Sequence, residues 1–142
     1  MPRLLIVGYG NRLRGDDGAG YRAAELLREG WSSPDVEILA VEQLTPELME
    51  PIGRAREVIF IDAAADGQPG EIRECPVVLL EAGATFTHHA TPAALLAGAV
   101  ALYGATASGV LYSIGGESFE LGERLTPAVE RAVAELVSRL AR

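Results

Sequence analysis

Residues 5–20 read LIVGYGNRLRGDDGAG, and this stretch decides how the chain begins to fold. The apolar run Leu4–Val7 predicts a short buried strand. The glycines that follow, five of the sixteen in the chain, predict a tight loop that leads into a helix. Strand, loop and helix in this order are typical of a βαβ unit, in which ligands bind at the carboxyl ends of the strands. Asp16 and Asp17 place negative charge at that point.

A nucleotide-binding loop is the ordinary alternative for a glycine-rich turn, and the residues here do not fit it. Gly8 and Gly10 match the first two glycines of the dinucleotide fingerprint, but Leu13 stands where the third is required. A pyrophosphate at this helix start would also face two carboxylates. A P-loop is excluded because it needs a lysine, and all twelve basic residues are arginine.

Composition limits the possible functions further. With 142 residues the chain has the size of a single domain, residues 1–142. The net charge of −8 argues against nucleic-acid partners, which require clustered basic residues. No apolar run reaches the roughly 18 residues of a membrane span, and no signal peptide is expected. Cys75 has no second cysteine in the chain with which to form a disulfide. We therefore expect a cytoplasmic, monomeric protein without a membrane partner.

Predicted strands and helices alternate along the rest of the chain. Strands are expected at Val36–Val41, Val58–Ile61, 71–80 and Val110–Ile114. Helices are expected at about 18–29 and from the Thr-Pro pairs at 45–46, 91–92 and 126–127, where threonine is the N-cap and proline the first helical residue. The continuous apolar run at 58–61 is typical of a parallel strand covered on both faces. We predict an α/β fold with one three-layer domain, in which helices cover both faces of a mainly parallel, twisted sheet.

Three groups of side chains at the expected strand ends could carry chemistry. Asp16 and Asp17 follow the first strand, Asp62 closes the third, and His88 and His89 precede the helix that starts at 92. Carboxylate and imidazole together make an oxygen–nitrogen ligand set that suits nickel, zinc or manganese. Each group also has an ordinary explanation. One aspartate of the pair could stabilise the helix N-terminus, Asp62 could be a solvated strand end, and the histidines could simply be exposed.

The same positions carry a resemblance that extends over nearly the whole chain. The motifs are Gly8-x-Gly10-Asn11, Gly15-Asp16-Asp17-Gly18-x-Gly20, Ile61-Asp62-Ala63, Pro69-Gly70-Glu71-Ile72, Thr87-His88 and Gly122-x-x-Leu125-Thr126-Pro127-x-Val129. In this order and spacing they resemble the hydrogenase maturation endopeptidases, and the first block is the specific one. The resemblance implies an α/β processing protease for nickel–iron hydrogenases. Such enzymes cut a short C-terminal extension from the large-subunit precursor after nickel insertion.

The resemblance also implies a site. Three positions of the family are proposed to contact the nickel, and they match Asp17, Asp62 and His88, with His89 as the alternative to His88. The same three residues are then the catalytic candidates. The nickel is held by the thiolates of the precursor, and the protease needs no tightly bound ion of its own. Two roles for the nickel stay open at this stage: recognition alone, or Lewis-acid polarisation of the scissile carbonyl as well.

One segment departs from the family pattern. Many members carry Asp-Gly-Gly-Thr after the second strand, a segment implicated in substrate recognition, whereas residues 41–45 here read VEQLT. The hydrogenase subtype is therefore left open. Two other functions also remain. One is a peptidyl-tRNA hydrolase-like enzyme, which the acidic net charge and the two adjacent aspartates oppose, and the other is a nickel-binding maturation module without protease activity.

Overall fold

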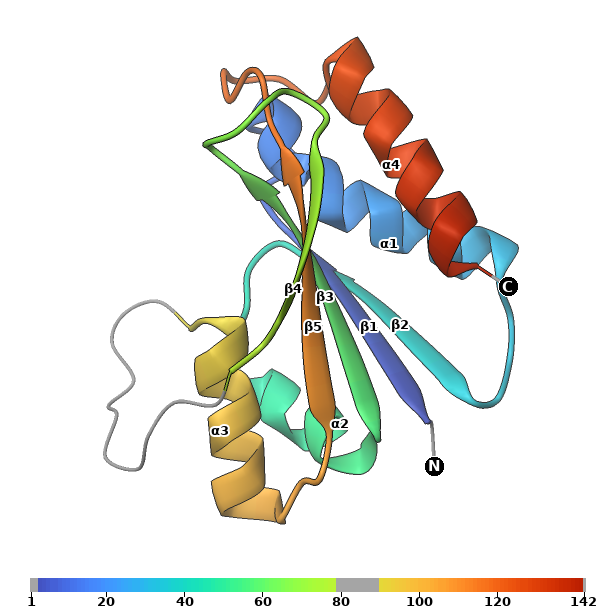
Figure 1. Ribbon diagram of the computed structural model, residues 1–142, viewed down its shortest axis with the longest axis vertical. Coiled ribbons are helices and arrows are strands. Elements are labelled where there is room, and N and C mark those ends of the chain that lie inside the picture. Colours follow the sequence, from blue (N-terminus) through green and yellow to red (C-terminus); the bar gives the residue numbers. More distant parts are fainter. Residues whose placement is uncertain (1–2, 79–89, 142) are drawn as a thin grey trace.

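The computed structural model describes residues 3–78 and 90–141, and within them the chain forms a five-stranded sheet with helices on both faces (Figure 1). The strand order is β2-β1-β3-β5-β4. The strands are β1 (Leu4–Tyr9), β2 (Val36–Val41), β3 (Glu57–Ala64), β4 (Ile72–Pro76) and β5 (Ser108–Gly115). β1, β2, β3 and β5 run parallel, and β4 lies antiparallel beside β5 at one edge.

The helices form a layer on each side of this sheet. They are α1 (Ala19–Gly30), α2 (Met49–Arg54), α3 (Pro92–Tyr103) and α4 (Pro127–Leu140), with 3₁₀ turns η1 (Gly15–Gly18) and η2 (Pro46–Leu48). α1 and α4 pack on one face, and α2 and α3 pack on the other (Figure 1). The predicted α/β fold, with a mainly parallel sheet between two helical layers, is confirmed. None of the described helices is long and apolar enough to span a bilayer.

Alternating side chains of the central strands supply the two halves of the core. In β1, Ile6 faces α1 and α4, whereas Leu5 and Val7 face α2 and α3. β3 repeats the alternation, with Ile61 on the first face and Phe60 on the second. All five side chains are fully buried. The central strands are thus fixed from both sides and form a firm base for the loops at their carboxyl ends.

β3 is longer than the sequence pattern predicts. The pattern places the end of this strand at Ile61 and Asp62, but β3 continues to Ala64 because β5 continues to pair with it. Asp62 pairs with Ser113 in this extension, and Ala64 pairs with Gly115. Asp62 is therefore a residue inside the strand, and its neighbour lies 51 residues further along the chain.

The strand expected at 71–80 is shorter than predicted within the described residues. β4 ends at Pro76, which pairs with Val110 near the start of β5. Val77 still donates to the carbonyl of Gly109 at 2.8 Å, one residue beyond the end of β4. The last two positions of the expected strand lie outside the described residues.

The carboxylate of Asp16 is fully buried and joins the loop after β1 to the segment between β5 and α4. Its Oδ2 accepts hydrogen bonds from the backbone N–H of Glu117 at 2.8 Å and of Ser118 at 3.0 Å. Thr126 donates twice, from its N–H to Oδ1 at 2.7 Å and from its hydroxyl to Oδ2 at 2.8 Å. Burial opposes the charge, but these four hydrogen bonds outweigh it and hold the pKa of Asp16 below its ordinary value.

This arrangement corrects the expected role of Thr126. Thr126 stands at the N-cap position of α4, but its side chain makes no capping hydrogen bond. Its hydroxyl turns to Asp16 instead, because a hydrogen bond to a carboxylate is stronger than one between neutral groups. Thr45 likewise precedes η2 without a side-chain cap. Thr91 accepts from the N–H of Ala94 at 3.1 Å and caps α3 as predicted.

We expect Asp16→Asn to lower the free energy of unfolding by about 3 kcal/mol, because the amide NH₂ would face a donor where an oxygen now accepts. The pKa of Asp16 is lower in the folded than in the unfolded chain. The contribution of Asp16 to folding stability is therefore complete at pH values above its unfolded-state pKa of about 4. It is lost as the pH falls through the lower pKa of the folded state. Urea titrations of the parent protein and the variant near neutral pH measure the loss of unfolding free energy. The same titrations below about pH 3 measure how far this difference has decreased.

Asp17→Asn is the matched control for this experiment. Asp17 is half-buried and accepts a hydrogen bond from the N–H of Asn11 at 2.8 Å. Its replacement should cost less than about 1 kcal/mol of stability. Equal destabilisation by the two variants would contradict the structural role assigned to Asp16.

Candidate functional site

The carboxyl ends of β1 and β3 lie at the point where the topology of the sheet reverses. The chain leaves β1 through α1 to reach β2 on one side, and then passes through α2 to β3 on the other side of β1. The β1–β3 ladder ends at Gly8 and Ile61, while β3 continues beside β5 as far as Ala64. Ligands of open α/β sheets bind at such a switch point. Asp17, in the loop after β1, and Asp62, in β3, both lie there.

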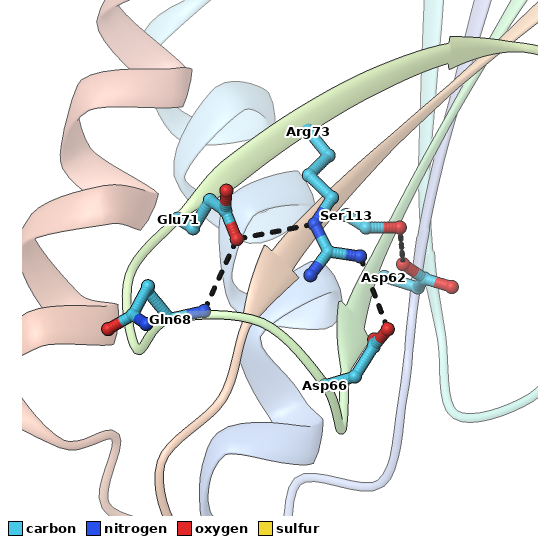
Figure 2. Close-up of polar contacts among 6 residues, drawn as sticks. All are labelled: Asp62, Asp66, Gln68, Glu71, Arg73 and Ser113. Atoms are coloured by element: carbon cyan, nitrogen blue, oxygen red, sulfur yellow. Dashed lines mark hydrogen bonds and ion pairs between the residues drawn. The ribbon is translucent and has the colours of Figure 1, made fainter.

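Asp62 is half-buried, and a hydroxyl group donates to each of its carboxylate oxygens. The Tyr9 phenol donates to Oδ2 at 3.0 Å, and the Ser113 hydroxyl donates to Oδ1 at 2.6 Å, the contact drawn in Figure 2. Burial raises the pKa of Asp62 above its ordinary value against the opposite effect of these hydrogen bonds, and the charge of Asp17 adds to the increase. Burial and the charge of Asp62 also raise the pKa of Tyr9, so the phenol stays neutral and remains a donor.

Arg73 of β4 does not neutralise this carboxylate. Arg73 pairs with Ser113 in the β4–β5 ladder, but its guanidinium turns to Asp66 at 3.4 Å and to Glu71 at 3.3 Å (Figure 2). Both contacts are at exposed side chains beyond the end of the site. In the part of the chain that the structure describes, Asp62 has hydroxyl partners and no cationic one.

The glycine loop brings Asp17 close to the end of β1. Its Oδ2 accepts a hydrogen bond from the N–H of Asn11 at 2.8 Å, which closes the loop. Gly10 has a φ of 148°, and a side chain there would overlap the backbone carbonyl of Asp17. A side chain at Gly20, in the first turn of α1, would overlap the carbonyl of Ile61 in the same way. The absence of side chains at these two glycines lets the helix, the loop and the strand ends meet.

Asp17 and Asp62 line one pocket of about 260 Å³. Its other walls come from β1, the segment after β2, β3 and the residues before α3: Tyr9, Gly10, Glu42, Gln43, Leu44, Ala63 and Ala90. The charged residues among them are all acidic, so the pocket favours cations and repels anionic groups. Arg12 holds Glu42 at the rim, with 3.1 Å between guanidinium and carboxylate, and stacks over the ring of Tyr21.

The predicted histidines, His88 and His89, lie outside the described residues, so the three-ligand site stays a prediction. The structure brings Asp17 and Asp62 to one pocket, and Ala90, which follows His89 in the sequence, lines the same pocket. Within residues 3–78 and 90–141, no three side chains of His, Cys, Asp or Glu are grouped so that they could hold a metal ion.

The two adjacent aspartates have different roles. Asp16 is completely buried among donors from the segment before α4, whereas Asp17 is half-buried and lines the pocket. Asp16 is a structural residue, but in another way than the ordinary explanation, in which one of the two stabilises the helix N-terminus. Its contribution comes from hydrogen bonds to a distant segment rather than from the helix N-terminus.

Sequence reasoning missed Tyr9 and Ser113, the two partners of Asp62. Both interrupt an otherwise regular pattern: Tyr9 stands between two glycines at a strand end, and Ser113 is a polar residue in the apolar run at 110–114. Such interruptions were available as a signal. They could not show which carboxylate the hydroxyls contact, because that depends on the order of the strands.

A larger groove, of about 910 Å³, lies on the side of the molecule formed by α1 and α4. Its walls come from these two helices and from the loops at 12–18 and 123–127. Its charged residues are three arginines and three glutamates, exposed except for one half-buried glutamate: Arg12, Arg22, Arg124, Glu25, Glu123 and Glu130. A balanced, solvated set of charges favours no class of ligand. We therefore place the candidate site in the smaller, acidic pocket.

The chain resembles solved structures of hydrogenase maturation proteases over nearly its whole length. The [NiFe] hydrogenase maturation protease HycI from Thermococcus kodakarensis KOD1 is 27% identical, with a TM-score of 0.80 over 97% of this chain and 89% of that one. An endopeptidase from Escherichia coli is 26% identical, with a TM-score of 0.69 over 97% of this chain and 89% of that one.

A third likeness shows the fold alone. The E. coli hydrogenase maturating endopeptidase HybD is 23% identical, with a TM-score of 0.68 over 97% of this chain and 89% of that one. Searches among models of protein families and among curated proteins give no match. The likeness to HycI combines a shared fold, near-complete coverage of both chains and identity above a quarter. On this ground, the chain has the fold of the hydrogenase maturation proteases and resembles that family over nearly its whole length.

Proposed function

We propose that the protein is a peptidase that removes the C-terminal extension from the large-subunit precursor of a nickel–iron hydrogenase. Nickel carried by the precursor is the recognition element. The observation that carries this proposal is the shared pocket of Asp17 and Asp62 at the switch point of the sheet. The likeness to the Thermococcus maturation protease HycI supports the class of reaction.

The pocket is suited to a cation that arrives with the substrate. Asp17 and Asp62 supply negative charge from two sides, and Glu42 adds to it at the rim. Each oxygen of Asp62 accepts one hydrogen bond from a side chain and keeps a lone pair for a further ligand. A nickel ion already held by thiolates can take such oxygens as additional ligands. We assign the imidazole contact to His88, with His89 as the alternative.

In this proposal, the position in which the pocket holds the precursor leads to cleavage. The nickel, as part of the precursor, anchors the folded subunit at Asp17 and Asp62, and the scissile peptide beyond it lies across the rim of the pocket. Water adds to the peptide carbonyl, the C–N bond breaks, and the new amine of the extension takes up a proton. Holding both reacting parts of the precursor in one geometry lowers the entropic part of the barrier.

Nickel in the precursor should decide whether cleavage occurs. We expect nickel-loaded precursor to lose its extension and nickel-free precursor to stay uncut, because only the former presents a cation to the two carboxylates. Mass spectrometry of both precursors after incubation with the protein measures this. Purified protein should contain well below one equivalent of metal when measured by elemental analysis, since the pocket offers oxygen ligands and no thiolate.

Two other outcomes have definite meanings. Stoichiometric zinc in the purified protein, together with full-rate cleavage of nickel-free precursor, would identify an ordinary metalloprotease and reject recognition through nickel. Tight binding of nickel-loaded precursor without any cleavage would instead identify a nickel-binding maturation module. A pull-down with the same two precursors separates this second outcome from a failure to bind.

Both pocket carboxylates should be essential for processing but not for folding. We expect Asp17→Asn and Asp62→Asn each to lower kcat/KM roughly 100-fold or more, because each removes a charged contact to the nickel. Their melting temperatures should lie within about 3 °C of the parent protein, since neither residue is completely buried. Asp66→Asn is the control: Asp66 follows β3 but is exposed and pairs with Arg73. Equal activity in all three variants would remove Asp17 and Asp62 from the site.

The two histidines can be separated by single substitutions. The Thr87-His88 pairing in the family motif favours His88 as the ligand. We therefore expect His88→Ala to abolish processing of nickel-loaded precursor and His89→Ala to leave most of it. The reverse result would assign the contact to His89, and equal losses would mean that both residues contribute. Processing rates and circular dichroism spectra of the two variants decide among these outcomes.

A further inference from the structure

Three side chains form a row across the middle of the sheet at its carboxyl edge. Tyr9 is the last residue of β1, Asp62 lies in β3, and Ser113 lies in β5. Asp62 pairs with Ser113 in the β3–β5 ladder. On the other side of β3, the β1–β3 ladder ends with the pair Gly8 and Ile61. Tyr9 and Asp62 are the next residues of the two strands, so they lie level with each other. Neighbouring residues in one row of a parallel sheet point to the same face.

The row places a hydroxyl on each side of one carboxylate. Tyr9 donates to Oδ2 of Asp62 at 3.0 Å, and Ser113 donates to Oδ1 at 2.6 Å. The donors come from strands on opposite sides of β3, and they lie 53 and 51 residues away in the sequence. A rotation of the Asp62 side chain about its Cα–Cβ bond, or of its carboxylate about the Cβ–Cγ bond, would break at least one of these contacts. The two strands therefore define the plane of the carboxylate as well as its position.

Neither hydroxyl is needed for the core. Tyr9 and Ser113 are half-buried, and although the Tyr9 ring packs against the core beneath α2 and α3, its hydroxyl reaches out of that core to Asp62. Tyr9 also lines the pocket, so its phenol contacts Asp62 from inside the site. Ser113 contacts Asp62 from the neighbouring strand, as Figure 2 shows.

We infer that Tyr9 and Ser113 are positioning residues, which hold the carboxylate of Asp62 in one orientation before the substrate arrives. A carboxylate fixed in this way presents its free lone pairs in one direction and loses little side-chain freedom when a ligand binds. The effect on cleavage rests on the proposed function. The effect on the side chain of Asp62 itself does not.

The kinetic test uses Tyr9→Phe and Ser113→Ala with nickel-loaded precursor. Because an unrestrained Asp62 contacts the nickel less well, we expect each variant to raise KM about tenfold and to change kcat little. Ser113→Thr retains the hydroxyl and should restore KM. A partly unfolded preparation would lower kcat at unchanged KM, so a fall in kcat alone would reject the positioning role.

Two substitutions control for the loss of a hydroxyl elsewhere. Tyr103→Phe alters an exposed tyrosine at the end of α3, and Ser108→Ala alters an exposed serine at the start of β5. Both should leave kcat and KM at the parent values. A tenfold rise of KM in either control would mean that the kinetic effect does not depend on Asp62.

A second measurement is independent of cleavage. Three-bond NMR couplings between the α proton and the methylene protons of Asp62 report rotation about the Cα–Cβ bond. They should indicate one rotamer about that bond in the parent protein and in Ser113→Thr, and averaging in the double variant of Tyr9→Phe with Ser113→Ala. A single rotamer in the double variant would overturn the inference. If the couplings behave as expected but the parent protein does not process any precursor, the proposed function fails and the positioning role of the two hydroxyls stands.

Discussion

The buried carboxylate of Asp16 is the contact on which the geometry of the carboxyl edge depends. It accepts four hydrogen bonds from Glu117, Ser118 and Thr126, which lie 101 to 110 residues away in the sequence. Three of the donors are backbone N–H groups and the fourth is the Thr126 hydroxyl. All four belong to a segment without regular structure, and without this carboxylate they would lose their hydration on burial and gain no partner in return. The loop after β1 and the approach to α4 are thus fixed against each other, and the loop carries Asp17 into the pocket.

The second element of the site comes from unequal strand lengths. Pairing between β1 and β3 ends at Ile61, while pairing between β3 and β5 continues to Ala64. Asp62 is therefore backed by a strand on one side and faces the glycine loop on the other. Had β1 continued as far as β5, its backbone would fill the space that the pocket occupies. Asp17 and Asp62 meet because one ladder stops and a neighbouring loop turns back across its end.

The sequence predicts local features of this fold well and long-range ones poorly. The sequence predicts both ends of β2 (Val36–Val41) correctly, because an apolar run between turns depends on neighbouring residues alone. The extension of β3 depends on its pairing with β5, so the local pattern misses it. The candidate carboxylates follow from motif and position at strand ends. Their partners Tyr9 and Ser113 become visible only with the strand order.

The two adjacent aspartates illustrate the same limit and its physical cause. In the sequence they are equivalent, but they occupy consecutive positions of the 3₁₀ turn η1. Successive side chains of such a turn point about 120° apart, so a turn that directs Asp16 inward must direct Asp17 elsewhere. Burial of the first residue thus orients the second, which reaches the pocket with one hydrogen bond from Asn11. The buried carboxylate of Asp16 and the pocket-lining carboxylate of Asp17 are thus coupled through the peptide bond between them.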